Sequence, residues 1–157
     1  MDPFGQFRTK LISSCKKQFC FQGLYKMSYI YFLGEQLTAV AATQSSTFTG
    51  AYEHPAANCI DGDTGPGEGE RKWAFCHTRN DRYPWFAVDY GKTYAIERVE
   101  IFNRHDCCGK RTKYVEVRVC EELPTSASQK FFGGSLLGNF AGPGTNGQHI
   151  IISGGDP

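Results

Sequence analysis

Several features that define other classes of protein are missing from this sequence of 157 residues. No apolar run approaches the ~18–20 residues of a membrane span, and no helical period of useful length occurs. The net charge is only +1, from 17 basic and 16 acidic residues, which argues against a nucleic-acid binder held by counterion release. The 14% aromatic content and 18 glycines exclude a disordered chain, a coiled coil and a collagen-like repeat.

Familiar catalytic motifs are missing as well. The sequence has no Gly-x-x-x-x-Gly-Lys phosphate loop, no His-Glu-x-x-His and no Cys-x-x-Cys pair for zinc. Cys76 stands directly before His77, which raises the question of a thiol nucleophile. Consecutive side chains of an extended segment point to opposite sides, whereas such catalysis needs them in contact. We therefore expect no enzymatic activity, and a neutral imidazole that donates and accepts toward hydroxyls is the simpler role for His77.

Seven cysteines are present, which is unusual for a reduced cytosolic protein. The number suits a secreted, extracellular protein with disulfide bonds. Because the count is odd, at least one thiol would then have no partner within the chain.

The first 33 residues differ from the rest. They carry five basic residues and one acid, a net charge of +4, which leaves −3 for residues 34–157. Their most apolar part, residues 27–33, is short for a signal peptide and is interrupted by polar and tyrosine side chains. We interpret residues 1–33 as a leader or extension of unknown role, and residues 34–157 as one domain.

Short alternating runs indicate an all-β domain. In residues 113–120, Val115, Val117 and Val119 would share one face, with Glu116 and Arg118 on the other. Further strands are expected at 85–90, 94–102, 129–132 and 149–153, and a glycine-rich stretch at 133–147 separates the last two. Short strands joined by long loops predict a β-sandwich or jelly roll, in which ligands bind at the end loops.

The densest group of polar residues lies in the turn between two of these strands. Arg104 and Arg111 bracket Asp106, so one carboxylate can orient two guanidiniums that keep further N–H donors. Such donors suit a neutral sugar, where each desolvated charge-assisted hydrogen bond is worth about 1.5–3 kcal/mol. The alternative is a solvated turn with a weak surface ion pair.

Cys107 and Cys108 are adjacent in the same turn. A disulfide between them would close an eight-membered ring that locks the turn, and such strain tends to occur at functional sites. Its two sulfurs would form a rigid apolar floor, which suits the methyl group of a deoxy sugar. The alternative is two independent thiols.

A third group, Asn58, Asp61 and Asp63, lies in a glycine-rich loop. Ca²⁺ is bound by six to eight oxygen ligands, and the side chains of this loop supply oxygens of that kind, although the loop does not fit an EF-hand. An Asx-rich turn without metal is the alternative.

Together these stretches resemble the F-type lectins, the fucose-binding domain first associated with eel agglutinin. The family pattern is a histidine, twenty-six residues, and Arg-x-Asp-x-x-x-x-(Arg or Lys), which His77, Arg104, Asp106 and Arg111 match, adjacent cysteines included. Residues 42–46, 58–63 and 84–89 resemble the family's first strand, calcium loop and Pro-Trp-Trp-x-Val-Asp strand.

The resemblance implies a jelly-roll β-sandwich that binds terminal α-L-fucose on glycans. His77, Arg104 and Arg111 would donate to the sugar, Asp106 would orient the arginines, and the Cys107–Cys108 disulfide would pack against the ring. It further implies structural Ca²⁺ at Asn58, Asp61 and Asp63, innate immune recognition or cell adhesion, and possible homo-oligomers for avidity. Tyr52, His54 and Phe75 are candidates for contacts with the neighbouring sugar.

The chain departs from the family at its end. The family's last strand carries a Cys-Glu pair, and this sequence stops just before it. We therefore expect a sandwich that lacks its last strand, a Cys76 without its family partner and a weakened calcium site. The competing readings are a discoidin-like adhesive or enzyme-associated module for another ligand, and a truncated fragment that binds nothing.

Overall fold

Strands form nearly all of the regular structure in this chain. The computed structural model describes residues 34–63, 75–120, 126–128 and 133–154, and describes residues 18–20 and 26–32 by their backbone. Its elements are β1 (Gln18–Cys20), β2 (Lys26–Phe32), β3 (Glu35–Gln36), β4 (Ala41–Gln44), η1 (Ala56–Cys59), β5 (Phe86–Asp89), β6 (Arg98–Phe102), η2 (Gly109–Arg111), β7 (Val115–Cys120), β8 (Ser135–Phe140) and β9 (His149–Ser153). Both helical elements, η1 and η2, are short 3₁₀ turns. In the described ranges no helix has the length and apolar character to cross a membrane.

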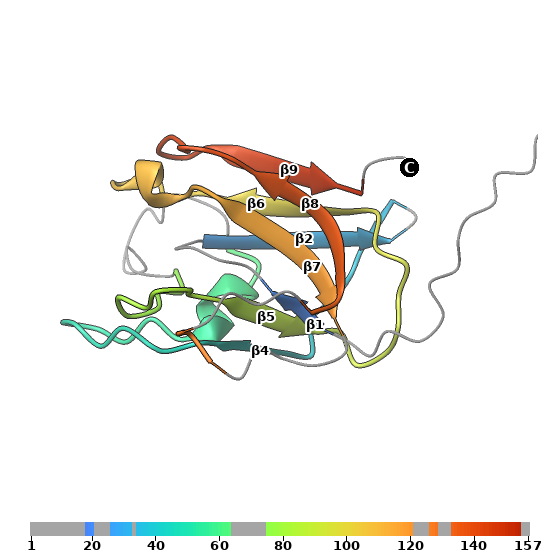
Figure 1. The fold of residues 1–157 in the computed structure, drawn as a ribbon, viewed down its shortest axis with the longest axis horizontal. Helices are drawn as coiled ribbons and strands as arrows, with labels where there is room; N and C mark the ends of the chain where they lie inside the picture. Colours follow the sequence, from blue (N-terminus) through green and yellow to red (C-terminus); the bar gives the residue numbers. More distant parts are fainter. Residues whose placement is uncertain are drawn as a thin grey trace, which may run out of the picture.

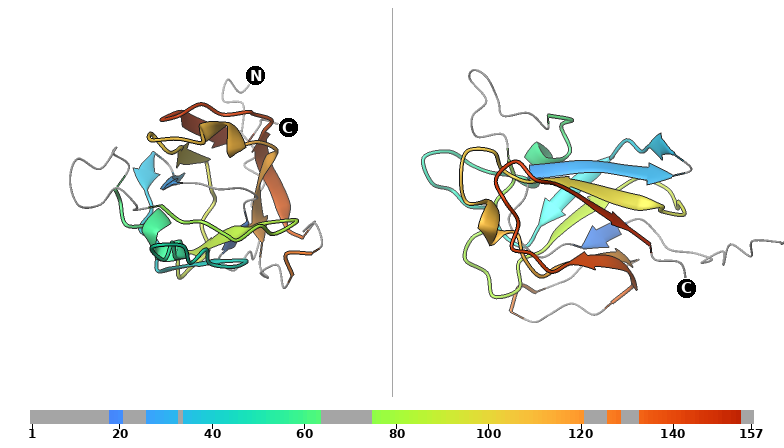
Figure 2. Two further views of the ribbon diagram at one scale, coloured as in Figure 1. Left: turned by 90° about the vertical axis from the view of Figure 1, so that its left-hand side faces the viewer. Right: turned by 90° about the horizontal axis from the view of Figure 1, so that it is seen from above.

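The strands pair into three antiparallel sheets, in the orders β3-β2-β6-β9, β1-β7-β8 and β4-β5. Figure 1 shows β2, β6 and β9 lying above β4 and β5, while β7 and β8 run obliquely between the two levels. Seen along the strands, the sheets surround a common interior (Figure 2, left). This arrangement confirms an all-β chain for the described residues. A jelly roll without its last strand stays a prediction.

The interior is filled by alternate residues of several strands. Burial in β9 alternates strictly, and in β7 Val115 and Val117 are fully buried between partly exposed neighbours. Each such apolar side chain stabilises the fold by roughly 1.5–3 kcal/mol relative to its exposed state. The buried core includes Phe86, Val88, Val99, Ile101, Val115, Val117, Ile150 and Ile152.

Most of the strands expected from alternation are present. β5 and β7 lie within the expected ranges, β9 coincides with its range, and β6 begins later than expected, at Arg98. The expected strand at 129–132 lies outside the described residues.

The glycine-rich stretch at 133–147 was expected to separate strands, and this prediction is wrong because β8 lies within it. A Cβ on Gly138 would come within 2.7 Å of Ile152 Cγ2, so the glycine permits close packing of β8 on β9. Glycine is typical of turns, but at position 138 it lies within a strand and allows β8 and β9 to approach closely.

Residues on both sides of the expected boundary at Gly34 pair in the same sheets. β1 pairs with β7, and β2 lies between β3 and β6, with Ile30 opposite Val99. The division into a leader and a domain stays a prediction. The strand pairing adds that residues 18–20 and 26–32 contribute backbone to the sandwich.

Candidate functional site

Loops from distant parts of the sequence gather at one end of the sandwich, on the left in Figure 1. The loop after β4 is joined to the segment before β5 by hydrogen bonds from Phe48 N–H to His77 O (2.8 Å) and from His77 N–H to His54 O (3.1 Å). The loop after β6 is joined to the loop after β8 by Gly147 N–H, which donates to Arg104 O at 2.6 Å. These hydrogen bonds join the end loops in two pairs, and the Arg104 guanidinium, which lies over the Phe75 ring, brings the two pairs together.

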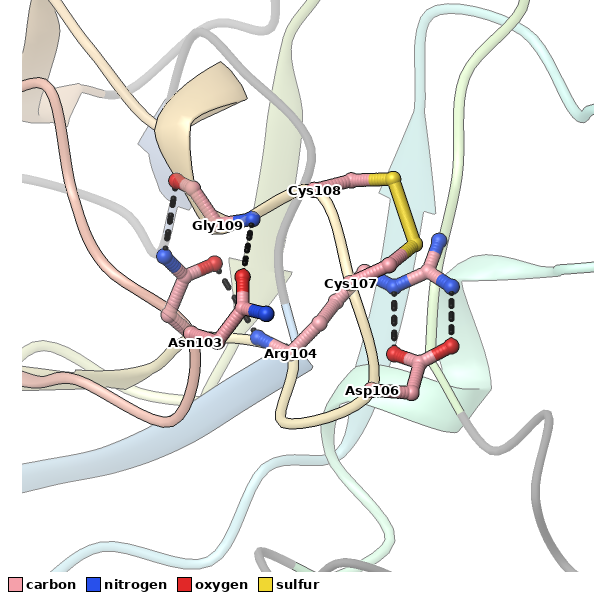
Figure 3. Close-up of a disulfide and its surroundings, with 7 residues drawn as sticks. Asn103, Arg104, Asp106, Cys107, Cys108 and Gly109 are labelled. Atoms are coloured by element: carbon pink, nitrogen blue, oxygen red, sulfur yellow. Dashed lines mark hydrogen bonds and ion pairs between the residues drawn. A yellow bond between two sulfur atoms is a disulfide. The ribbon is translucent and has the colours of Figure 1, made fainter.

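Arg104 and Asp106 form a two-point ion pair in the loop after β6 (Figure 3). Arg104 Nε donates to Asp106 Oδ1 at 2.9 Å and Nη2 donates to Oδ2 at 2.6 Å. The hydrogen bonds from Arg104 hold the pKa of Asp106 below its usual value. Because the Asp106 side chain is 52% exposed, the pair adds little to stability. Its effect is to fix the plane of the Arg104 guanidinium; the spacing predicted that Asp106 would orient Arg111 as well, but among the described residues Asp106 pairs with Arg104 alone.

The buried side chain of Asn103 supports the loop that follows β6. The residue is 1% exposed and uses both ends of its amide. Nδ2 donates to Gly109 O and to Thr145 O, each at 2.9 Å. Oδ1 accepts from Arg104 N–H at 3.0 Å and from the Thr112 hydroxyl at 2.9 Å. The sequence does not predict this role, since Thr145, one of the four partners, is 42 residues away and becomes a neighbour only when the loops fold together.

Cys107 and Cys108 are joined by a disulfide, which Figure 3 shows in yellow. Cys108 has a left-handed backbone (φ 65°), and its carbonyl accepts from Arg111 N–H at 2.9 Å as η2 begins. The reading of these residues as two independent thiols is therefore excluded. Both sulfurs belong to the same loop as Arg104 and Arg111.

His77 is only partly buried, and its ring is oriented by the backbone. Nδ1 lies against Thr78 O, and since a carbonyl can only accept, Nδ1 carries the proton of that contact. Burial lowers the pKa of His77, and the nearby His54, Arg104 and Arg111 lower it further, against the raising effect of the Thr78 contact. The neutral ring therefore offers Nε2 as an acceptor, which differs from the donor role that the resemblance implied.

Four rings form an aromatic cluster beside the guanidinium of Arg104. His54 stacks on Phe75 with centroids 4.4 Å apart, and Phe48 contacts His77 at 4.8 Å. The Arg104 guanidinium lies over Phe75, 4.0 Å from the ring centroid. Phe48 is 41% exposed, whereas His54 and Phe75 are buried. Sequence reasoning named His54 and Phe75 as possible sugar contacts but missed Phe48, which no periodic pattern distinguishes.

Arg111 completes the group from the end of η2. It is exposed, and its charge acts on His77 together with that of Arg104. Among the described residues, no carboxylate pairs with Arg111. Unlike Arg104, it is therefore not oriented by Asp106, and its N–H groups can be directed toward a ligand.

The loop predicted to bind calcium contains a disulfide that was not expected. Cys59 is bonded to Cys76, so Cys76 has a partner other than the one in the family's last strand. η1 brings Cys59 beside the segment that carries His77, with Cα atoms 5.4 Å apart.

The three candidate calcium ligands share this loop but not one orientation. Asp61 Oδ1 accepts from Asp63 N–H at 2.9 Å, as in an Asx turn, and Asn58 Nδ2 donates to Phe75 O at 3.4 Å. No group of three or more acidic, histidine or cysteine side chains with metal-binding geometry occurs among the described residues. The oxygen-rich turn suits a hard cation but provides only part of the six to eight oxygens that Ca²⁺ takes.

Comparison with known families gives a match to a family model described as NedA-like, galactose-binding domain. It covers residues 58–136, half of the chain, and includes His77, the arginine loop with its adjacent cysteines and the candidate calcium ligands, whereas Phe48, Tyr52 and His54 lie before it. No solved structure matches the chain.

Curated relatives include several fucolectins. Fucolectin from Anguilla anguilla is 34% identical over 88 residues, which cover 54% of each chain. Fucolectin-6 from Anguilla japonica is 40% identical over 74 residues, 45% of this chain and 38% of that one. A pentraxin fusion protein from Xenopus laevis is 31% identical over 64 residues, 41% of this chain and 13% of that one. The chain spans about half the length, or less, of these relatives.

Proposed function

Because the chain belongs to the NedA-like, galactose-binding domain family, we propose that it is a non-enzymatic lectin domain that binds terminal α-L-fucose on glycans. The fucolectin relatives support the choice of sugar. The observation that carries the proposal is the approach of Arg104, Arg111 and His77 at one end of the sandwich. The charges of Arg104 and Arg111 lower the pKa of His77, and Asp106 holds Arg104 in place.

Hydrogen bonds donated by Arg104 and Arg111 would orient the sugar in the site. Arg104 uses Nε and Nη2 for Asp106 and retains Nη1 for a hydroxyl or ring oxygen of the sugar. Arg111 donates from the other side, and His77 Nε2 accepts from a hydroxyl group. Each charge-assisted bond contributes about 1.5–3 kcal/mol when desolvated. A single shallow site is weak, so linked copies, for example in a homo-oligomer, would raise avidity by roughly 10²–10⁴-fold.

An apolar surface beside these donors favours a deoxy sugar. The half-exposed ring of Phe48 and the Cys107–Cys108 sulfurs provide contacts for the methyl group that distinguishes L-fucose from L-galactose. A methyl group placed in an apolar pocket gains about 1–3 kcal/mol. L-Galactose, which has a hydroxyl on that carbon, is therefore expected to bind about tenfold more weakly.

Retention on immobilised L-fucose tests the proposal. We expect Arg104→Ala and Arg111→Ala to be lost from the resin while remaining folded, because each removes donors without opening the core. Arg98→Ala, which removes an arginine from β6, is the matched control and should be retained like the parent chain. Retention of both site variants would sink the assignment.

A second candidate is a module of the same fold that binds another ligand, and the family's description as galactose-binding favours it. Calorimetric titration with L-fucose, L-galactose and D-galactose separates the two. D-Galactose binding without L-fucose binding identifies the second candidate. No binding of any of these sugars together with an absent cooperative melt identifies a fragment that binds nothing.

The remaining parts of the proposal concern the setting of the domain. We propose that Ca²⁺ binds the turn at Asn58, Asp61 and Asp63 and stiffens it without touching the sugar. Two disulfides support an oxidising, extracellular location, because such bonds persist there. Innate immune recognition or cell adhesion would be the corresponding role.

A further inference from the structure

A groove of about 700 Å³ is lined in part by Arg111 and has the size of small-molecule sites. It is bounded by the segment before β5, the beginning of β7 and the end of β8. We call it the Tyr114 groove, and the residues that matter for its chemistry are Arg82, Tyr83, Arg111, Lys113, Tyr114 and Phe140.

The groove is electropositive. Three cations line it, Arg82, Arg111 and Lys113, and in the described ranges no carboxylate pairs with any of them. Glu116, the one acid among the described residues of its wall, accepts from Arg118 Nε at 3.2 Å. The field inside the groove therefore favours an anionic group.

The cations lie close to aromatic rings. The Arg82 guanidinium lies 5.4 Å from the centroid of Tyr83, and Lys113 Nζ lies 5.7 Å from that of Tyr114. The groove thus combines flat apolar faces with positive charge. A sugar ring packs on such a face while an attached anion reaches the cation beside it.

Tyr114 is presented to solvent by an unusual backbone. Its side chain is 72% exposed, and its φ of 54° lies in the left-handed region, which is strained for an aromatic residue. Such a conformation costs about 1–3 kcal/mol and tends to be kept where it serves binding. The hydrogen bond from Tyr114 N–H to Ala141 O, at 3.0 Å, holds the turn in place.

Arg111 connects this groove to the proposed fucose site. The residue lines the groove, and it lies in the same connection between β6 and β7 as Arg104 and the Cys107–Cys108 disulfide. A glycan whose fucose contacts Arg111 from one side therefore continues into the groove on the other. This continuity selects the sugar next to fucose as the occupant.

We propose that the Tyr114 groove binds the second sugar of a fucosylated glycan and selects one that carries an anionic group, a sulfate ester or a carboxylate. The inference rests on the proposed function. The sugar ring packs against Tyr114, and the anion is held by Lys113 and Arg82.

Titration with four ligands tests this inference on the whole chain: L-fucose, a neutral fucosyl disaccharide, its sulfated form, and the form whose second sugar is a uronic acid. We expect at least one anionic disaccharide to bind tenfold or more tightly than the neutral one in low salt. The gain should shrink as ionic strength rises, because the charges are exposed. The anionic disaccharide with the larger gain in affinity identifies sulfate or carboxylate as the preferred anion.

Variants locate the effect. Lys113→Ala and Arg82→Ala should each reduce the anionic gain severalfold and leave L-fucose affinity unchanged. Tyr114→Asn, whose new residue tolerates the left-handed backbone, should weaken both disaccharides alike. Lys92→Ala is the matched control, since Lys92 lies over Tyr94 at 5.2 Å away from the groove, and it should change nothing.

The outcomes separate this inference from the function on which it rests. No L-fucose binding overturns the proposed function and the groove assignment with it. L-Fucose binding with equal affinity for neutral and anionic disaccharides overturns the groove assignment alone. So does an anionic gain that Lys92→Ala reduces as much as Lys113→Ala does.

Discussion

Replacing Asn103 by alanine tests whether one buried amide supports the whole sugar-binding loop. The substitution removes four hydrogen bonds: those to Gly109 O and Thr145 O, and those from Arg104 N–H and the Thr112 hydroxyl. The side chain is 1% exposed, so bulk water does not reach these groups directly. Leaving a buried polar group without a partner costs about 1–3 kcal/mol.

The partners differ in how far they are buried, which sets the expected magnitude. Gly109 and Thr112 are buried, whereas Arg104 is partly exposed and Thr145 is exposed. Counting the two buried partners in full and the others at a fraction, we expect Asn103→Ala to lower the free energy of unfolding by about 3–4 kcal/mol. With a urea m-value of about 1–3 kcal/mol per molar, the unfolding midpoint should fall by roughly 1–4 M.

Urea unfolding followed by tryptophan fluorescence measures this change. Asn80→Ala, at an exposed position, serves as the control and should shift the free energy of unfolding by under about 0.5 kcal/mol. Fucose affinity should also fall in Asn103→Ala under conditions where the chain is folded, because Arg104 loses the anchor of its backbone. A shift below about 1 kcal/mol in Asn103→Ala, or equal shifts in both variants, would refute the assignment of the loop's support to this amide.

The remaining predictions concern charge, pH, redox state and metal. Asp106→Asn should lower fucose affinity about tenfold, by calorimetry, with little change in stability because the ion pair is half exposed. The pKa of His77 is lowered in the folded state, so the unfolded chain takes up the proton first and stability should fall as pH drops below about 6.5. His77→Gln should reduce that slope in thermal melts, and an unchanged slope would contradict the assignment. Cys107→Ser/Cys108→Ser should lose fucose binding at a nearly unchanged melting temperature, and a retained affinity would show that the sulfurs are not contacts. Chelation of Ca²⁺ should lower the melting temperature of the parent chain and not that of Asp61→Asn; equal responses would argue against calcium at this turn.

Sequence alone predicts the strands whose burial alternates. In β7, Val115 and Val117 repeat every second position, and the structure buries both. β8 escaped prediction because its run of Ser135–Phe140 has no such alternation: its burial follows the approach of Gly138 to β9 rather than side-chain polarity. A period of two in the sequence indicates a strand with one exposed and one buried face. It does not identify a strand that is positioned by close packing of its backbone.

The candidate site likewise contains residues that the sequence predicts and residues that it does not. The residue types and spacing of Arg104, Asp106 and the adjacent cysteines were informative, since these residues are close in sequence and interact within one loop. Asn103 was not recognisable as a support, because its partner Thr145 is 42 residues away. Tyr114 was likewise unremarkable in the sequence, since its importance comes from a backbone conformation and a groove that three separate segments form.

The two disulfides act on opposite halves of the proposed site. Cys59–Cys76 closes a loop across a sequence separation of 17 and ties η1 to the segment that ends in His77. A loop of about this length is stabilised by roughly 3 kcal/mol in the chain-entropy account. Cys107–Cys108 instead constrains only its own turn, between Arg104 and Arg111. The first bond therefore holds the histidine and aromatic side of the site, and the second shapes the arginine side. Neither bond links the two halves, and the Arg104 guanidinium joins them by lying over the Phe75 ring, 4.0 Å from its centroid.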